Sequence, residues 1–111
     1  MEKPGPLQPA TFLVLLVLAG GDRHGYGIRQ DVRDFDPDFE LGPATLYTTI
    51  QRLLESRWIR EVPAPAGADS RRRYYRVTRE GNSVLNLELE RMESMVRKSK
   101  AMRLRSAESV S

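Results

Sequence analysis

The residues that favour β-strands are concentrated in one pair of segments in the second half of the chain. Residues 58–62 and 71–77 are rich in β-branched and aromatic side chains, and the turn-forming stretch 63–70 lies between them. Two such runs joined by a flexible loop predict an antiparallel hairpin. Because the remaining segments have helical patterns, the chain is limited to a mainly α-helical (α+β) fold with one small two-stranded sheet.

The first helical segment, residues 10–19, is apolar almost throughout. Its run of seven apolar residues from Phe12 to Leu18 is far shorter than the ~20 residues that cross a bilayer, so we expect no membrane span. A secretory signal is an alternative, although the residues before it hold three prolines and only one lysine. The other interpretation is a first helix that is buried on nearly all sides and ends at Gly20–Gly21.

The next two segments are amphipathic. Residues 24–34 are expected to be helical, with Ile28, Val32 and Phe35 on one face, and Pro37 interrupts the linker that follows. A third helix begins near Pro43, a residue that suits the first helical position. Its apolar face consists of Leu46, Ile50, Leu53 and Leu54. The opposite face carries short polar side chains and one arginine, namely Thr45, Thr48 and Arg52.

A last helix is expected from about residue 79, with Thr78 as its N-cap. Its apolar residues recur at intervals of four, three and four, which is typical of a seam between two helices. No later element follows to cover this seam, so its partner is either the first helix of the same chain or a second copy of the chain. We expect a homodimer with this interface, and we expect the polar segment after Lys98 to fray. The interface residues are Leu85, Leu89, Met92 and Val96.

The charges are unevenly distributed along the chain. The net charge is −3 for residues 1–41, +5 for residues 42–79 and +1 for residues 80–111. A clustered basic segment is the feature expected of a protein that binds a polyanion. The basic third contains the third helix and the hairpin, so these two elements are the candidates for contact with nucleic acid.

Composition excludes most catalytic chemistry. The chain has no cysteine and one histidine, His24. Thiolate metal sites, cysteine nucleophiles and zinc sites with two imidazoles are therefore excluded within one chain. The acidic run from Asp34 to Glu40 resembles the start of a calcium loop, but Phe39 stands where that loop requires glycine. We expect neither an enzyme nor a bound metal or cofactor.

The order of elements is that of a winged helix-turn-helix with an added dimerisation helix. Three helices are followed by a hairpin, the wing, and then by one more helix. In this arrangement the third helix enters the major groove of DNA and the wing arginines reach the phosphates. The expected divisions are a flexible tail at residues 1–9, a DNA-binding domain at residues 10–78, and a dimerisation helix with a polar tail at residues 79–111.

Several short motifs carry a resemblance to a known family. They are His24-Gly-Tyr-Gly-Ile28, Gly42-Pro-Ala-Thr-Leu-Tyr47, Ile50-Gln-Arg-Leu-Leu-Glu55, Trp58-Ile59 and Arg72-Arg-Tyr-Tyr-Arg-Val-Thr78 followed by Gly81. Together they span about residues 10–81, and the sequence resembles the PadR family of bacterial transcriptional regulators, in its short subtype with one C-terminal helix. The resemblance implies a homodimeric cytoplasmic repressor that binds a double-stranded operator and is often released by a small, hydrophobic effector.

The resemblance also implies which residues contact DNA. On the third helix they are Thr45, Tyr47, Thr48 and Arg52, and in the wing they are Arg71, Arg72 and Arg73. Threonine and tyrosine hydroxyls suit phosphates, whereas Arg52 is the candidate for a base edge.

The sequence departs from the family pattern at two positions: Gly42 replaces the usual serine before the third helix, and Arg57 replaces the usual glycine after it. A winged-helix module that binds a protein or a ligand instead of an operator is therefore the alternative function.

Overall fold

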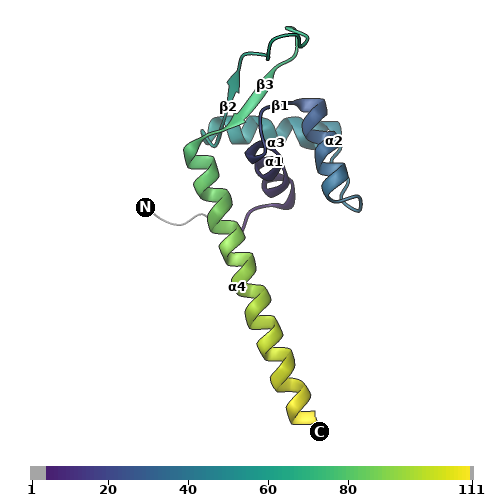
Figure 1. Ribbon diagram of the computed structural model, residues 1–111, viewed down its shortest axis with the longest axis vertical. Helices are drawn as coiled ribbons and strands as arrows, with labels where there is room; N and C mark the ends of the chain where they lie inside the picture. The colour runs from purple at the N-terminus through teal and green to yellow at the C-terminus, as the bar shows by residue number, and fades with distance from the viewer. Residues whose placement is uncertain (1–4, 111) are drawn as a thin grey trace.

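The computed structural model describes residues 5–110, with side chains described to residue 107. The elements are α1 (Pro9–Ala19), β1 (Arg23–His24), α2 (Gly25–Phe35), α3 (Pro43–Glu55), β2 (Ile59–Val62), β3 (Tyr74–Val77) and α4 (Arg79–Val110). This order confirms the predicted winged helix-turn-helix with an added C-terminal helix (Figure 1).

The apolar run near the N-terminus forms the central helix of the core. Leu13, Val14, Leu15 and Leu18 of α1 are buried, and α1 contacts α2, α3, α4 and β3. Because helices and strands surround it, α1 needs apolar residues on nearly every side. Phe12, Leu16 and Val17 are half-buried, so the predicted burial on nearly all sides is met in part.

The sheet has three strands where the sequence predicted two. β3 lies in the centre and pairs with β2 on one side and with β1 on the other, both antiparallel. β1 holds only Arg23 and His24, which pair with Tyr75 and Tyr74. A two-residue strand has no alternation of its own, so no periodic pattern marked it in the sequence.

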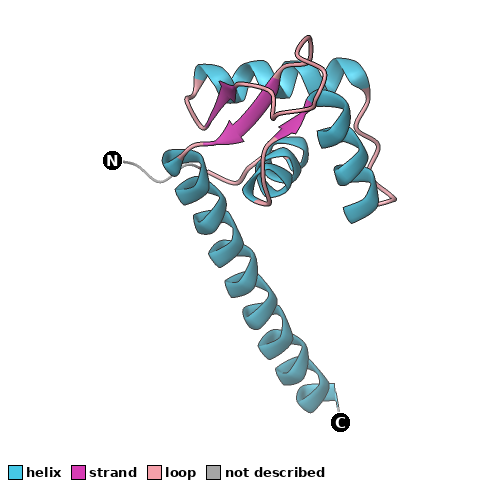
Figure 2. Cartoon of the chain, turned by 45° about the horizontal axis from the view of Figure 1, so that its top comes forward, coloured by secondary structure: helices cyan, strands magenta, loops and turns pink. Residues whose placement is uncertain are grey.

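α4 is the longest element, with 32 residues, and it projects away from the other helices as an arm (Figures 1 and 2). The first part of α4 packs on α1, and Val84 and Leu85 are buried there. The expected fraying after Lys98 is wrong for the described residues, because the helix continues to Val110. Lysine, arginine, alanine, leucine and methionine dominate residues 97–105 and are strong helix formers, so intrinsic propensity maintains the helix beyond the apolar seam.

One further sequence expectation differs from the structure. Phe35 was placed on the apolar face of the second helix, yet its side chain is 62% exposed because α2 ends at this residue and the chain turns away. Of the expected flexible tail, residues 1–4 lie outside the described residues, whereas the backbone N–H of Leu7 donates a 3.0 Å hydrogen bond to Glu88 Oε2 on α4.

Candidate nucleic-acid interface

The outer face of α3 presents the four side chains that the sequence assigned to DNA. Thr45, Tyr47, Thr48 and Arg52 are all exposed. Tyr47 is 62% exposed, which is too much for a core residue and leaves its ring and hydroxyl available for contact. The opposite face holds the helix to the core through its buried residues Leu46, Thr49, Ile50 and Leu53.

The two departures from the family pattern both lie at the ends of α3. Gly42 is the N-cap, makes no side-chain cap hydrogen bond and precedes Pro43 in the first turn. At the other end, Arg57 has a φ of +63°, a left-handed conformation that glycine adopts more easily. The N–H of Arg57 bonds to Leu54 O at 3.1 Å and the N–H of Trp58 bonds to Leu53 O at 3.0 Å. These paired bonds form a Schellman motif, so α3 ends as it would with glycine but with a strained residue.

The three wing arginines lie in the loop before β3. The expectation of a strand from residue 71 is wrong, because β3 begins only at Tyr74. Asp69 explains the difference: its Oδ1 accepts the backbone N–H of Arg71 at 2.9 Å, and its carbonyl accepts the N–H of Arg72 at 3.1 Å. This Asx turn uses N–H groups that a strand would need, so Arg71, Arg72 and Arg73 project from a turn and are all exposed.

The fourth arginine of the wing has a structural partner. Arg76 on β3 makes two contacts with the Asp22 carboxylate, at 2.9 and 2.7 Å, which tie the wing to the turn after α1. The hydrogen bond from Arg76 holds the pKa of Asp22 below its usual range. Arg71 has a similar bidentate contact with Asp69, but its side chain is 89% exposed, so solvent weakens this pair and Arg71 can exchange it for another anion.

A hollow of about 490 Å³, here called the wing hollow, joins the wing to α3 and to the start of α2. It brings Tyr47 together with all three wing arginines, which are distant in sequence, whereas Thr45, Thr48 and Arg52 lie outside its lining. No sequence motif marked the other residues of this hollow as DNA contacts. Its lining consists of His24, Gly25, Tyr26, Tyr47, Arg71, Arg72, Arg73 and Tyr75.

The basic surface continues from the wing hollow across α2. Tyr26 also borders a smaller hollow that it shares with Arg29, Gln30 and Arg33, and the two arginines line a third hollow with Gly42, the N-cap of α3. Arg29 is held there by a 2.8 Å hydrogen bond from its Nε to Leu41 O. Neither arginine was predicted to contact DNA, because both belong to the net-acidic first third of the chain. Their spacing of four residues, which places them on one face of a helix, is the only sequence signal that could have identified them.

His24 lines the wing hollow and caps α2. Its Nδ1 accepts the N–H of Gly27 at 3.1 Å, and its Nε2 lies 2.8 Å from Arg72 Nη1. The ring stacks parallel to Tyr26 and meets Tyr74 edge-on, with centroids 6.5 and 5.3 Å apart. Burial, and then the charge of Arg72, lower the pKa of His24, so the ring is neutral at physiological pH.

The predicted dimer seam divides into two parts. Leu85 is only 2% exposed and belongs to the core of its own chain, and Leu89 is partly buried against that core. Val96 is 52% exposed, and it lines a shallow hollow of about 400 Å³ together with Leu89, Met92, Glu93 and Arg97. The outer part of the seam is thus an apolar helix face that no described residue of this chain covers.

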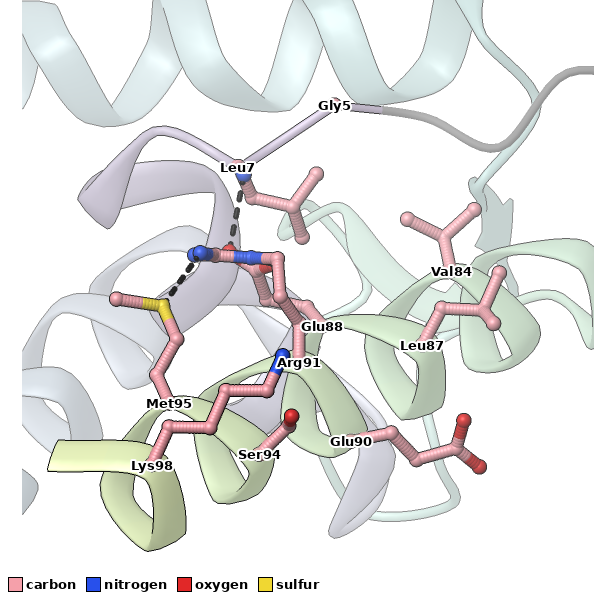
Figure 3. Close-up of a pocket in the computed structure, with 10 residues that line it drawn as sticks. All are labelled: Gly5, Leu7, Val84, Leu87, Glu88, Glu90, Arg91, Ser94, Met95 and Lys98. Atoms are coloured by element: carbon pink, nitrogen blue, oxygen red, sulfur yellow. Dashed lines mark hydrogen bonds and ion pairs between the residues drawn. The ribbon is translucent and has the colours of Figure 1, made fainter. Parts of the chain in front are cut away.

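Another hollow, of about 340 Å³, lies where the N-terminal segment crosses α4 (Figure 3). Its walls are mostly apolar and include Leu7, Leu87 and Met95. Glu88 is only 4% exposed here, and Arg91 Nε contacts it at 2.6 Å. The hydrogen bond from Arg91 lowers the pKa of Glu88 more than burial raises it, so the carboxylate is charged and satisfied.

Comparison with known proteins agrees with this geometry. The family model of the transcriptional regulator PadR-like family matches residues 14–87, which include the second half of α1, all of α2 and α3, the wing and the start of α4. The chain belongs to the PadR-like family. This PadR-like chain is also 31% identical over 75 residues to a protein of Lysinibacillus sphaericus recorded as "Uncharacterized protein X", a match that covers 67% of this chain and 69% of that one.

Solved structures resemble this PadR-like regulator over most of its length. A transcriptional regulator from Clostridium thermocellum is 26% identical, with a TM-score of 0.68 over 83% of this chain and 87% of the other. A PadR family transcription regulator from Clostridium difficile is 24% identical, with a TM-score of 0.72 over 87% and 99%. The PadR-like chain is therefore a transcriptional regulator of the winged-helix type, and members of this family are not enzymes.

Two other kinds of site are absent from residues 5–110. No helix within residues 5–110 is both long and apolar enough to span a membrane. Among the same residues, no group of three or more His, Asp or Glu side chains is arranged to hold a metal ion.

Proposed function

We propose that this PadR-like regulator is a homodimeric repressor that binds a pseudo-palindromic DNA operator in the cytoplasm. The observation that carries the proposal is the continuity of one exposed surface. It runs from the outer face of α3 through Tyr47 into the wing hollow with its three arginines. A duplex seated on α3 would place a phosphate strand over this hollow, because the wing and the recognition helix flank the same groove.

The residues would divide between positioning and reading. Thr45 and Tyr47 carry hydroxyls suited to phosphate oxygens, and such contacts position the protein without selecting a sequence. Thr48 offers a methyl group to a thymine. Arg52 has no ion pair among the described residues, so its guanidinium is available to a guanine edge.

The experiment is a fluorescence anisotropy titration with the DNA upstream of the protein's own gene, at two salt concentrations and with unrelated DNA as competitor. Binding should be tight, should resist the competitor and should weaken steeply with salt. Arg52→Ala should reduce the preference for the operator by about tenfold, the effect of losing one bidentate base contact of ~1–3 kcal/mol. Arg103→Ala, which removes the same charge from the exposed far end of α4, is the matched control and should leave binding unchanged.

The wing is tested separately from α3. Replacing Arg71 and Arg73 by alanine should weaken binding to the operator and to unrelated DNA alike, because phosphate contacts carry no sequence information. Unchanged affinity would remove the wing from the interface. Equal, weak binding of the wild-type protein to both duplexes would instead favour the alternative, a winged-helix module whose partner is a protein or ligand.

The dimer would form through the outer seam of Leu89, Met92 and Val96. Val96→Asp should convert the protein to monomers in analytical ultracentrifugation, because it places a charge inside the seam. The chain itself should still fold, since Val96 is 52% exposed in one copy. Met102→Asp lies outside the seam at a 63% exposed position and should leave the dimer intact. An unchanged sedimentation coefficient for Val96→Asp would rule out this interface.

Release by a small hydrophobic effector fits the hollow beneath the N-terminal segment best. Its apolar walls include Leu7 from the N-terminal segment and Leu87 and Met95 from α4 (Figure 3). Because α4 also carries the seam, a bound molecule would alter how two copies pack. Leu87→Arg should abolish the response of operator binding to such an effector while leaving operator affinity intact. A retained response would place the effector elsewhere.

A further inference from the structure

The contacts of His24 cannot all be hydrogen bonds. A guanidinium has only donors, so Arg72 can only donate to the ring. A backbone N–H also only donates, so Gly27 needs a lone pair on Nδ1. A neutral imidazole has one lone-pair nitrogen and one N–H. One of the two contacts, Gly27 N to Nδ1 at 3.1 Å or Arg72 Nη1 to Nε2 at 2.8 Å, must therefore bring two donors together.

The helix cap is the contact that must be a true hydrogen bond. The N–H of Gly27 is in the first turn of α2, where backbone donors have no partner within the helix. Arg72 is exposed and can donate its protons to water instead. The favoured tautomer thus has its lone pair on Nδ1 and its proton on Nε2. His24 Nε2–H and Arg72 Nη1–H then point into the same small region of the wing hollow.

We propose that these two donors form a binding site for a phosphate oxygen. An oxygen with several lone pairs can accept from both N–H groups, and this acceptance turns a repulsive donor pair into two charge-assisted hydrogen bonds. The exposed Arg72 side chain can move aside to admit it.

The surroundings favour an anion of this size. The wing hollow, of about 490 Å³, is lined by Arg71 and Arg73 as well, and none of its lining residues is a carboxylate. The hydroxyl of Tyr47 lies near Gly25, where an added Cβ would meet it at 3.6 Å. The rings of Tyr26 and Tyr74 hold the imidazole in place, so its Nε2–H is directed before any ligand arrives.

Two sources could supply the phosphate oxygen. In the complex proposed above, and resting on that proposal, it belongs to the operator backbone beside the wing. Inorganic phosphate or a phosphorylated small molecule offers the same chemistry without DNA. With either source, His24 contacts the ligand, a role that its sequence motif did not predict.

His24→Asn separates the ligand role from the capping role. Asparagine is among the best N-cap residues, so it keeps an acceptor for Gly27 while removing the Nε2–H donor. Operator affinity should fall about tenfold, the usual effect of one hydrogen bond to a charged group. Arg72→Gln should cause a similar loss, and the double variant should lose little more, because both donors hold one oxygen. Strictly additive losses, or no loss for His24→Asn with an unchanged melting temperature, would overturn the shared site.

A spectroscopic test distinguishes the sources and separates this proposal from the proposed function. His24 is the only histidine, so ¹⁵N-labelled histidine gives one unambiguous ring signal in the full-length protein. In phosphate-free buffer the Nε2–H tautomer is expected. Saturable shifts of Nε2 on adding inorganic phosphate support the site even if no duplex binds. Shifts with duplex alone support it as a backbone contact. An Nδ1–H tautomer, or an unmoved signal while the operator binds tightly, would overturn the site and leave operator recognition standing.

Discussion

Gly81→Ala tests how α4 is joined to the DNA-binding domain. Gly81 lies buried in the first turn of α4, against the backbone of Trp58 at the end of the α3–β2 turn. A Cβ at this position would overlap the carbonyl oxygen of Trp58 and would lie 2.8 Å from its carbonyl carbon. The same oxygen accepts the N–H of Thr78 at 2.9 Å. The start of α4 and the backbone at Trp58 cannot move apart without weakening that hydrogen bond.

Two opposing terms decide the outcome. Alanine is the better helix former, which favours the variant by about 1 kcal/mol. Overpacking against well-placed neighbours costs about 1–3 kcal/mol or more, and here the neighbour is backbone that cannot change rotamer. Loss of the hydrogen bond from Thr78 adds about 1 kcal/mol. The steric term wins, and we expect a net destabilisation of about 1–3 kcal/mol.

Urea denaturation followed by the fluorescence of Trp58, the single tryptophan, measures this loss directly. For an m value of about 1.5 kcal/mol/M, the midpoint should fall by roughly 1–2 M. The protein concentration must be held constant because the proposed dimer would contribute to apparent stability. Asn82→Ala, one residue further at an exposed position, is the control and should be slightly stabilising. A Gly81→Ala protein as stable as the wild type would refute the close approach of α4 to Trp58.

Three further predictions concern stability. Arg57→Gly should stabilise the fold by up to about 1 kcal/mol, because glycine relieves the strain of the left-handed conformation at φ +63°. The higher entropy of the unfolded glycine chain offsets part of this gain, and urea denaturation measures the net difference. Folding lowers the pKa of His24 below its usual 6.5, so the neutral ring contributes stability above pH 6.5, and this contribution is lost as the pH falls from 6.5 through the folded-state pKa. The free energy of unfolding should therefore be smaller at pH 5.5 than at pH 7.5, and His24→Asn should reduce this difference. Gly42→Ser should add a few tenths of a kcal/mol by supplying the missing cap hydroxyl at a position where a Cβ meets nothing within 4 Å, and a lowered melting temperature would contradict this.

The parts of the fold that follow from local sequence patterns were predictable from the sequence. The spacing of Leu46, Ile50 and Leu53 defined the buried face of α3 and therefore also its outer face. The sequence also marked the end of α3 as unusual, because Arg57 stands where the family has glycine, and Arg57 adopts the left-handed conformation that glycine favours. These features depend on local periodicity and local backbone preference, which a single sequence records.

The parts that depend on contacts between distant segments were not predictable. His24 meets Arg72 across 48 positions, and the strand β1 exists only because β3 offers it a free edge. The turn that holds Arg71 outside the sheet depends on one aspartate side chain, which outweighs the β propensity that follows it. The arginines on one face of α2 did not stand out in the sequence, because the net charge of the first third also counts the acidic residues on the other face of this helix.

Thr78 gives the wing and the arm a common mechanical pivot. It is the single residue between the end of β3 and the start of α4, and its Oγ1 accepts the N–H of Gly81 at 3.0 Å while donating to Arg57 O at 2.8 Å. With a rise of 1.5 Å per residue, α4 is a lever about 48 Å long. A tilt of about 5° at Thr78 therefore sweeps the far end through about 4 Å, slightly more than the ~3.4 Å spacing of base pairs. A displacement of the far end of α4 therefore reaches the wing through Thr78, together with the packing of α4 on α1 and of Gly81 on Trp58.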